Sequence, residues 1–126
     1  MEETLRALAH AHARGVLHLD VKPVNILRST KQDVRPGWKL ADFGIGRIAG
    51  QMADDAEVRG TPAYMAPEQI RDKRDHLGPW TDLYALACSV WLQVCREAPY
   101  GRDKPKHVIL AHLNGCLLYT SPSPRD

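Results

Sequence analysis

Residues 18–25 read HLDVKPVN, and three further short motifs follow them along the chain. These are DFG at residues 42–44, GTPAYMAPE at residues 60–68, and Asp82 at the head of a long apolar run. Each is a weak signal on its own, because short triplets such as DFG also occur in ordinary turns. Four motifs in this order and at this spacing indicate one composite site.

The side chains in these motifs carry the functional groups that phosphoryl transfer requires. Such a transfer needs an oriented hydroxyl, metal ions on the phosphates, and positive charge near the transferred phosphoryl oxygens. The motifs supply carboxylate and amide oxygens, which are ligands that magnesium prefers, together with the ammonium group of Lys22. The residue types are therefore those that such a site needs.

In this order the motifs resemble the eukaryotic-type protein kinase family, over residues 4 to about 101. The resemblance implies an α+β protein-kinase-like fold. We expect residues 1–115 to form a partial kinase domain, which is the mainly helical carboxyl-terminal lobe with a small β-hairpin. The β-rich amino-terminal lobe, with its glycine-rich phosphate-covering loop and its strand lysine, is expected to be absent.

The resemblance also implies a role for the polar residues of the first two motifs. Asp20 would orient the substrate hydroxyl and accept its proton, and Lys22 would stabilise the transferred phosphate. Asn25 and Asp42 would hold the magnesium ions. These four residues form the expected catalytic set, and Lys22, Asn25 and Asp42 would also contact ATP. Leu27 completes the nucleotide site as part of the floor beneath the adenine ring.

Four other residues are expected to support the site rather than to react. The resemblance places His18 in the packing between the two lobes and Asp82 at the head of a buried helix. Phe43 and Gly44 belong to the metal-binding loop, where glycine gives the backbone a freedom that a Cβ would remove.

Two positions indicate the class of substrate. Lys22 within D-x-K-P-x-N and Thr61 within G-T-x-x-Y resemble the serine/threonine branch of the family, so the expected partner is a protein modified at Ser or Thr. Glu68, at the end of the same segment, pairs in the family with an arginine near the carboxyl end of the domain. Because that arginine would be missing, Glu68 is expected to be unpaired.

Two alternatives stay open at this point. Residues 60–69 resemble bacterial-type members of the family, whereas residues 18–23 resemble the inhibitory cell-cycle kinases of the Wee/Myt type. A pseudokinase or scaffold that uses the kinase fold for protein binding is the alternative to an enzyme. The complete set of Asp20, Lys22, Asn25 and Asp42 favours the enzyme, because a scaffold has no need to retain all four.

One departure from the family pattern concerns regulation. Leu19 stands where most of these kinases have an arginine that pairs with a phosphate on the activation loop. Between Gly44 and Gly60 the chain also has no Ser, Thr or Tyr that could carry such a phosphate. The sequence therefore predicts activity that does not depend on activation-loop phosphorylation.

Hydrophobic periodicity predicts the local structure. Apolar residues recur at helical spacing over residues 2–12, and Gly15 follows in the place of a helix-ending glycine. The other expected elements are strand-like segments at 16–18 and 24–27, a return strand at 38–41 that makes a hairpin, a long loop at 44–60, and a buried core helix at 83–95.

The isolated histidines and cysteines are expected to have ordinary roles. His10 and His12 are expected to be solvated residues of the first helix. Cys88 and Cys95 lie seven residues apart and so share a helix face, where they are expected to act as small hydrophobic residues. The three cysteines form neither a C-x-x-C pair nor a zinc-binding pattern, which favours a reducing compartment.

Composition and charge exclude several classes. The 17 Lys and Arg residues nearly balance the 15 Asp and Glu residues, so the chain lacks the basic surplus of a nucleic-acid-binding protein. Its longest apolar run is shorter than a membrane span, and its first residues lack the pattern of a secretory signal. A cytoplasmic protein is the expectation.

The last eleven residues, CLLYTSPSPRD at 116–126, differ from the rest of the chain. They resemble a translated transposase-based sequencing adapter at every position. We therefore expect 116–126 to be an adapter-derived tail rather than part of a domain.

Overall fold

The computed structural model describes residues 1–43, 47–48, 61–71, 74–101 and 104–114. Helices outnumber strands among its elements, and the strands form two small antiparallel sheets. The elements are α1 (Glu2–His12), β1 (Val16–Leu17), η1 (Pro23–Asn25), β2 (Ile26–Ser29), β3 (Gly37–Leu40), β4 (Arg47–Ile48), η3 (Pro62–Tyr64), α2 (Pro67–Ile70), η4 (Arg74–His76), α3 (Pro79–Cys95) and α4 (Pro105–Asn114). This content agrees with the expected partial kinase-like fold.

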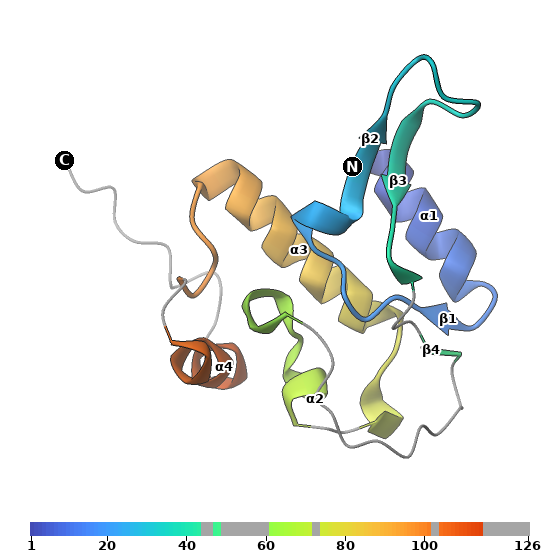
Figure 1. Cartoon of the computed structure of the whole chain (residues 1–126). Coiled ribbons are helices and arrows are strands. Elements are labelled where there is room, and N and C mark those ends of the chain that lie inside the picture. Colours follow the sequence, from blue (N-terminus) through green and yellow to red (C-terminus); the bar gives the residue numbers. More distant parts are fainter. Residues whose placement is uncertain (44–46, 49–60, 72–73, 102–103, 115–126) are drawn as a thin grey trace.

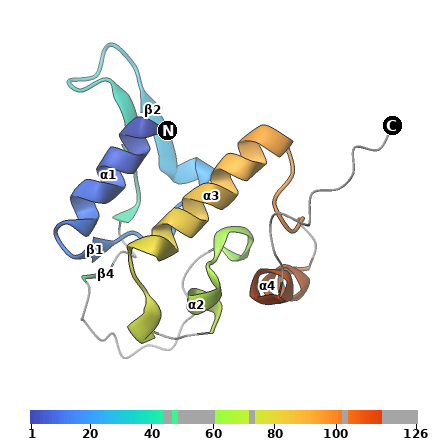
Figure 2. The ribbon, with the colours of Figure 1, turned by 180° about the vertical axis from the view of Figure 1, so that it is seen from behind.

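Helix α3 runs through the middle of the molecule. Helix α1 and the β2–β3 hairpin lie on one side of it, and α2 and α4 lie on the other (Figure 1). The reverse view shows the same order, with α1 and α4 at opposite ends (Figure 2). The carboxyl-terminal lobe is thus built on one long helix.

The core lies where α1 and α3 meet the loop between β1 and η1. Leu8 of α1, Val21 of the loop, and Ala85 and Leu86 of α3 form its buried centre. Four partly buried side chains pack around this centre, and they are Ile26, Leu40, Tyr64 and Val90. Burial of large aliphatic side chains contributes about 1.5–3 kcal/mol each, so this small core fixes the loop between α1 and α3.

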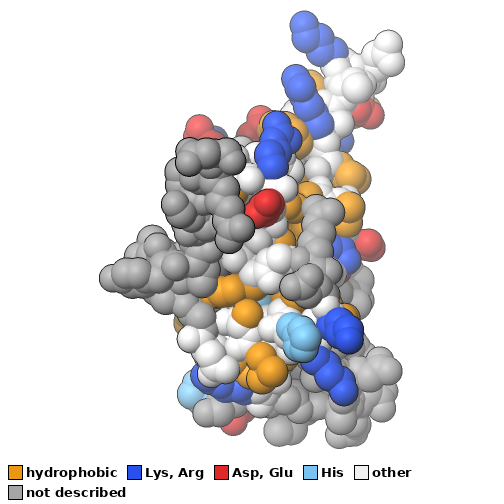
Figure 3. Space-filling view, turned by 90° about the vertical axis from the view of Figure 1, so that its left-hand side faces the viewer, with side chains coloured by type: hydrophobic (Ala, Val, Ile, Leu, Met, Phe, Trp, Pro, Cys, Tyr) orange, Lys and Arg blue, Asp and Glu red, His pale blue; other side chains and the backbone are white. Residues whose placement is uncertain are grey.

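The β2–β3 hairpin is held against α1. Ile26 pairs with Leu40 and Ser29 with Gly37, in an antiparallel register. The Glu3 carboxylate accepts the backbone N–H of Trp38 at 2.7 Å, which ties the first turn of α1 to the start of β3. Lys and Arg side chains gather at the far end of the hairpin, at the top of Figure 3.

Several predicted elements are confirmed. The helix at 2–12 has the expected bounds, and Gly15 adopts a positive φ of 71° just after it. The hairpin is also confirmed, although its strands begin and end one or two residues away from the expected positions. The expected tail at 116–126 lies outside the described residues.

The expectation of a continuous loop over 44–60 is wrong at one place. Arg47 and Ile48 form the short strand β4, which pairs antiparallel with Leu17 and Val16 of β1. Two residues give too short a pattern for periodicity to detect. The other residues of this range lie outside the described part of the chain.

Helix α3 is buried on one face only, so the expectation of a buried core helix at 83–95 is wrong for its other face. Cys88 on the core face is fully buried, whereas Leu83, Val94 and Cys95 are exposed. Met1 and Leu5, at the start of the chain, line an open hollow together with Leu83, Val94 and Cys95 of α3. Cys88 and Cys95 therefore lie in different surroundings.

Candidate active site

A buried carboxylate organises the loop that carries the first motif. Asp82, in the first turn of α3, is fully buried. Its Oδ2 accepts the backbone N–H of His18 at 2.9 Å, and its Oδ1 accepts that of Leu19 at 2.8 Å. Burying a carboxylate costs free energy, and the hydrogen bonds that it accepts from several N–H groups offset that cost. Asp82 therefore fixes the path of the chain just before Asp20.

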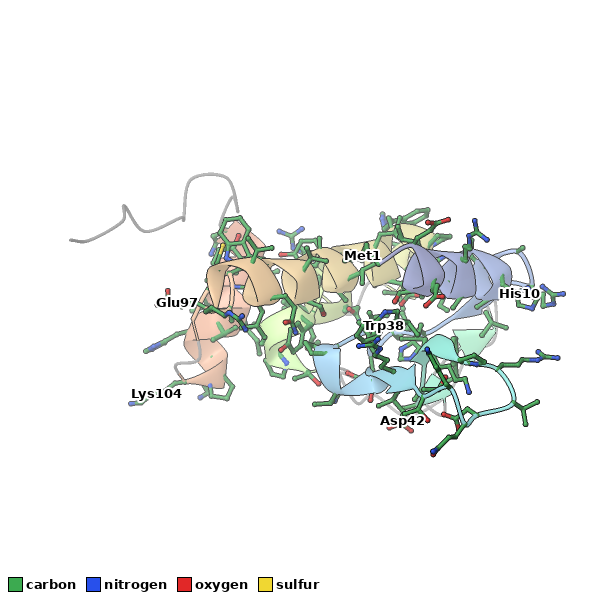
Figure 4. All side chains as sticks on the ribbon, turned by 90° about the horizontal axis from the view of Figure 1, so that it is seen from above. Met1, His10, Trp38, Asp42, Glu97 and Lys104 are labelled. Atoms are coloured by element: carbon green, nitrogen blue, oxygen red, sulfur yellow. The ribbon has the colours of Figure 1, made fainter. Side chains whose placement is uncertain are left out.

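A histidine of α1 completes the partners of this carboxylate. The Nε2 atom of His12 lies 2.7 Å from Asp82 Oδ2, and the His12 side chain is only 12% exposed. The expectation that His12 is solvated is thus wrong, because the turn after α1 brings the end of the helix over α3. His10 is exposed, and Figure 4 shows it pointing away from the molecule.

Leu19 has an unusual backbone conformation that its neighbours maintain. Its φ is 63°, in the left-handed region that a branched residue rarely adopts. Asp82 holds its N–H, and the Gln69 side-chain amide donates to its carbonyl at 3.1 Å. Two buried polar side chains, one from α3 and one from α2, therefore impose this conformation and turn the chain toward Asp20.

The carboxylate of Asp20 lies at the centre of a polar cluster. Its Oδ1 accepts the Thr61 hydroxyl at 3.0 Å, and its Oδ2 lies 3.0 Å from Lys22 Nζ. Lys22 Nζ also donates to the Thr61 hydroxyl oxygen at 2.9 Å. The side chains of Asp20 and Lys22 are 12% and 24% exposed, so the pair is largely enclosed and still reaches solvent.

Asn25 joins this cluster to the segment that leads to Asp42. Its side-chain amide donates to the Asp20 carbonyl at 2.9 Å, with a longer contact of 3.4 Å to Asp20 Oδ2. Its own carbonyl accepts the backbone N–H of Ala41 at 2.7 Å. The DFG segment therefore begins directly beside the first motif.

The His18 ring makes a second link between these two segments. Its Nδ1 accepts the backbone N–H of Asp20 at 3.1 Å, so Nε2 carries the proton and donates it to the Ala41 carbonyl at 2.7 Å. The ring also meets Phe43 edge to face, with 4.5 Å between ring centroids. The buried His18 ring thus joins the backbone at Asp20 to the backbone at Ala41.

The described residues of the four motifs therefore lie together in space, as expected for one composite site. The family model for the protein kinase domain matches residues 1–122. The chain belongs to the protein kinase family. In this chain Asp20 belongs to the first motif and Asp42 to the second. Asp82 accepts two backbone N–H groups of the first motif.

Curated kinases from animals and bacteria are similar to this kinase chain. "Death-associated protein kinase related" of Drosophila melanogaster is 34% identical over 94% of the chain and 17% of its own length. "Serine/threonine-protein kinase PknL" of Mycobacterium tuberculosis is 35% identical over 90% of the chain and 28% of its own length. The predicted serine/threonine kinase family is thereby confirmed. The chain spans less than a third of the length of the curated relatives it matches.

Asp42 and Asn25 form the donor set that a metal ion could use in this kinase domain. Asp42 is exposed, has a φ of 65°, and lies on the side of the hairpin away from α1 and α3 (Figure 4). The hydrogen bonds of the Asn25 side chain use Nδ2, which leaves Oδ1 as an available ligand. Within the described residues, no three His, Cys, Asp or Glu side chains form a metal cluster. An Mg²⁺ ion with one protein carboxylate and phosphate oxygens fits this sparse set.

Two predicted residues of the kinase site remain. Leu27 on β2 is 50% exposed. Gly44 lies outside the described residues. No helix in the described part of the chain has both the length and the apolar character needed to cross a membrane.

Glu68 is not left without a partner, contrary to expectation. Its Oε1 accepts the hydroxyl of the fully buried Thr81 at 2.8 Å. Thr81 also accepts the backbone N–H of Gly78 at 3.2 Å, which satisfies one of the donors at the start of α3. The Thr81 hydroxyl thus provides a hydrogen bond to the Glu68 carboxylate, for which an arginine partner was expected.

The motifs did not predict three side-chain contacts that support the site, which are those of His12, Gln69 and Thr81. The partners lie 70, 50 and 13 residues away in the sequence, and Gln69 and Thr81 are direct neighbours of quoted motif residues. For His12, its position on the helix face could have indicated that it is partly buried. His12 lies four residues after Leu8 and one after Ala11, both of which are buried, so it borders the core side of α1.

Proposed function

We propose that this chain is the carboxyl-terminal part of a catalytic domain that transfers the γ-phosphate of ATP to Ser or Thr hydroxyls of proteins. The observation that carries the proposal is the cluster of Asp20, Lys22 and Thr61. It combines a largely enclosed carboxylate, an ammonium group 3.0 Å away, and an aliphatic hydroxyl that contacts both.

The Thr61 hydroxyl indicates how an alcohol fits between these charges. It donates to Asp20 Oδ1 and accepts from Lys22 Nζ at the same time. A substrate hydroxyl that donates to Asp20 in the same way would have its oxygen oriented for attack and its proton directed to a base. The size and polarity of a serine or threonine side chain suit this arrangement.

Each charged residue has a separate task in the proposed reaction. Asp20 orients the acceptor hydroxyl and takes its proton as the oxygen–phosphorus bond forms. Lys22 offsets the negative charge that gathers on the transferred phosphoryl oxygens, and its Nζ lies 3.0 Å from Asp20 Oδ2. Asn25 fixes the position of Asp20 through its backbone carbonyl.

Asn25 Oδ1 and Asp42 would hold Mg²⁺, and Leu27 would contact the base of the nucleotide. When bound, ATP supplies the phosphoryl group and Mg²⁺ neutralises charge on its phosphates. The hydrogen bond from the Ala41 N–H to the Asn25 carbonyl holds the residue before Asp42 next to Asn25. Thr61 and Glu68 mark the two ends of the segment that would receive the protein substrate.

The test joins residues 1–115 to the amino-terminal lobe of a curated relative, the kinase PknL, and measures magnesium-dependent phosphorylation of a generic basic protein. We expect incorporation at Ser and Thr only. Asp20→Asn should lower the turnover about 10²- to 10⁴-fold, as expected when a positioned base is lost. Asp33→Asn, at an exposed position in the hairpin turn, is the matched control and should leave the turnover unchanged.

The 126-residue chain by itself should transfer no phosphate, because it contains no glycine-rich loop to cover the nucleotide. A hybrid that folds, binds nucleotide and transfers nothing would contradict the proposal and would favour a pseudokinase or scaffold. Phosphorylation on tyrosine alone would contradict the assigned substrate class.

A further inference from the structure

Gln69 is a nearly buried side chain that joins α2 to the loop of the first motif. It is 9% exposed. Its Oε1 accepts the backbone N–H of Ala66 at 3.1 Å, and its Nε2 donates to the Leu19 carbonyl at 3.1 Å. An N–H needs an acceptor and a carbonyl needs a donor, so these two bonds fit only one orientation of the amide. Gln69 is therefore held at the start of α2 and reaches across to Leu19.

The peptide unit between Leu19 and Asp20 is bonded on both of its edges. Its carbonyl accepts from Gln69 Nε2, and its N–H donates to His18 Nδ1 at 3.1 Å. Because a peptide unit is planar, these two bonds together fix its rotation. The Cα atom of Asp20 is attached to this plane, so the plane sets the direction in which the Asp20 side chain leaves the backbone.

Leu19 would relax to another conformation if its bonds were lost. A branched residue with a φ of 63° is strained, and it keeps this conformation only while its neighbours hold it. Asp82 Oδ1 holds the N–H of Leu19 at 2.8 Å, on the side of α3. Leu19 is only 7% exposed, so water has little access to its carbonyl as a substitute for Gln69. Loss of the Gln69 amide would therefore move the backbone directly before Asp20.

The segment that contains Gln69 also contacts Asp20 itself. Thr61 lies eight residues before Gln69, and its hydroxyl donates to Asp20 Oδ1 at 3.0 Å. The Thr61 bond holds the carboxylate end of the Asp20 side chain, whereas the Gln69 bond holds the backbone from which that side chain starts. Residues 61–69 are thus joined to the first motif at two places.

We infer that Gln69 is a positioning residue for Asp20. It acts through the peptide unit between Leu19 and Asp20, and it makes the direction of the Asp20 carboxylate depend on the place of α2. The inference rests on the proposed function only in giving Asp20 a role in catalysis. The need for a hydrogen-bond donor at Gln69 is a property of the folded chain and requires no reaction.

Two substitutions separate this hydrogen bond from the packing of the side chain. Gln69→Met keeps the length and most of the volume of the side chain but removes both polar atoms. Gln69→Glu keeps the shape and the acceptor for the Ala66 N–H, but when it is ionised its second oxygen faces the Leu19 carbonyl without a proton. The protonated carboxyl can donate to that carbonyl again, so the effect of Gln69→Glu should weaken as the pH falls.

The test is amide hydrogen exchange of the full 126-residue chain, measured for single residues by NMR and corrected for intrinsic rates. At pH 8.0 the protection of the Asp20 N–H should be about ten- to a hundredfold lower in Gln69→Met and Gln69→Glu than in the original chain. At pH 5.5 the loss in Gln69→Glu should shrink, whereas the loss in Gln69→Met should stay the same. The amides of β2 and β3 are the internal reference and should not change.

Each variant is compared with the original chain at the same pH. His18 accepts the Asp20 N–H and Asp82 holds the Leu19 N–H, and both side chains can titrate. They are present in the variants and in the original chain alike, so their effect cancels in the ratio. Gln93→Met and Gln93→Glu, at an exposed position of α3, are the matched controls and should equal the original chain.

Unchanged protection of the Asp20 N–H in Gln69→Met would overturn the inference. Equal losses in Gln69→Glu at the two pH values would also overturn it, because they would show that the side chain only fills space. A measurement on the unaltered chain covers the case in which a variant does not fold. One Nε2 proton of Gln69 should exchange at least about tenfold more slowly than those of the exposed Gln32 and Gln93, and equal rates would contradict the inference.

The hybrid kinase described under the proposed function tests the connection to catalysis. Gln69→Met should lower its kcat about ten- to a hundredfold and change its KM for ATP less than about threefold, because the residue places the base and does not hold the nucleotide. An unchanged kcat beside a lost protection of the Asp20 N–H would overturn the inference. Hydrogen exchange needs no ATP, so an original hybrid that transfers no phosphate counts against the proposed function alone.

Discussion

His12 and Asp82 are 70 residues apart in the sequence, yet His12 Nε2 lies 2.7 Å from Asp82 Oδ2. The same carboxylate accepts two backbone N–H groups, from His18 and Leu19. One buried acid therefore joins the end of α1, the first motif and the start of α3. The contacts of Asp82 show that a fully buried side chain holds the backbone of the first motif in place.

Asp82→Ala should lower the free energy of unfolding by about 2–6 kcal/mol. The N–H groups of His18 and Leu19 would lose their acceptor inside the core, and each such loss costs about 1–3 kcal/mol. Urea denaturation followed by circular dichroism measures the effect. Asp75→Ala, at an exposed position, should stay within about 0.5 kcal/mol of the original chain. Equal stability of the two variants would show that Asp82 is dispensable.

Gly37→Ala should destabilise the hairpin more than Gly15→Ala destabilises the turn after α1. A Cβ at Gly37 would lie 3.1 Å from a Glu3 carboxylate oxygen, and the φ of 130° there is unfavourable for alanine. At Gly15 the φ is 71° but nothing lies within 4 Å, so only the backbone cost of about 1–2 kcal/mol remains. Thermal unfolding of both variants tests this order, and a smaller loss for Gly37→Ala would contradict it.

Cys95 should react with iodoacetamide in the folded chain at pH 8, and Cys88 should react at least about a hundredfold more slowly. Cys95 is exposed, whereas burial raises the pKa of Cys88 to about 12 and keeps it as an unreactive thiol. The rate at Cys88 should keep rising with pH up to about that value. Mass spectrometry of the labelled peptides measures each rate. In urea the two cysteines should react equally, and equal rates without urea would refute the prediction.

Phosphatase treatment of an active protein that contains this chain should leave its turnover nearly unchanged. Leu19 provides no positive charge for a phosphate, and residues 44–60 contain no hydroxyl to carry one. Leu19→Arg should therefore not create a dependence on phosphorylation. Loss of activity after phosphatase treatment, with the phosphate mapped to Thr61 or Tyr64, would show that activation works differently.

Hydrophobic periodicity and turn residues predicted much of the fold, because they reflect interactions between residues close together in the sequence. The helix at 2–12 follows from its apolar spacing, and the hairpin follows from two apolar segments on either side of a turn. The exposed side of α3 could not be predicted, because an apolar run does not say which of its faces the rest of the chain covers. The helix at Pro105–Asn114 was not predicted at all, and its hydrophobic residues show only weak amphipathic spacing.

The candidate site was predicted where a motif names its residues, as with Asp20 and Lys22. The contacts of His12 and Glu68 depend on where α1 and α2 meet α3, which no local pattern encodes. A histidine at a helix end is usually exposed, so composition alone favoured the wrong environment for His12. Long-range pairs of this kind become visible only when the helices are placed in space.

The dependence of the first motif on Asp82 also sets an order of events during synthesis. His18 and Asp82 are 64 residues apart, so at about 5–20 residues per second the ribosome adds Asp82 about 3–13 seconds after His18. Until then the His18 and Leu19 N–H groups have no carboxylate to accept them, and the left-handed turn at Leu19 has no support from α3. A nascent chain that ends before α3 therefore lacks the carboxylate that holds the loop carrying Asp20. The loop that carries Asp20 therefore acquires its shape late, although it is made early in synthesis.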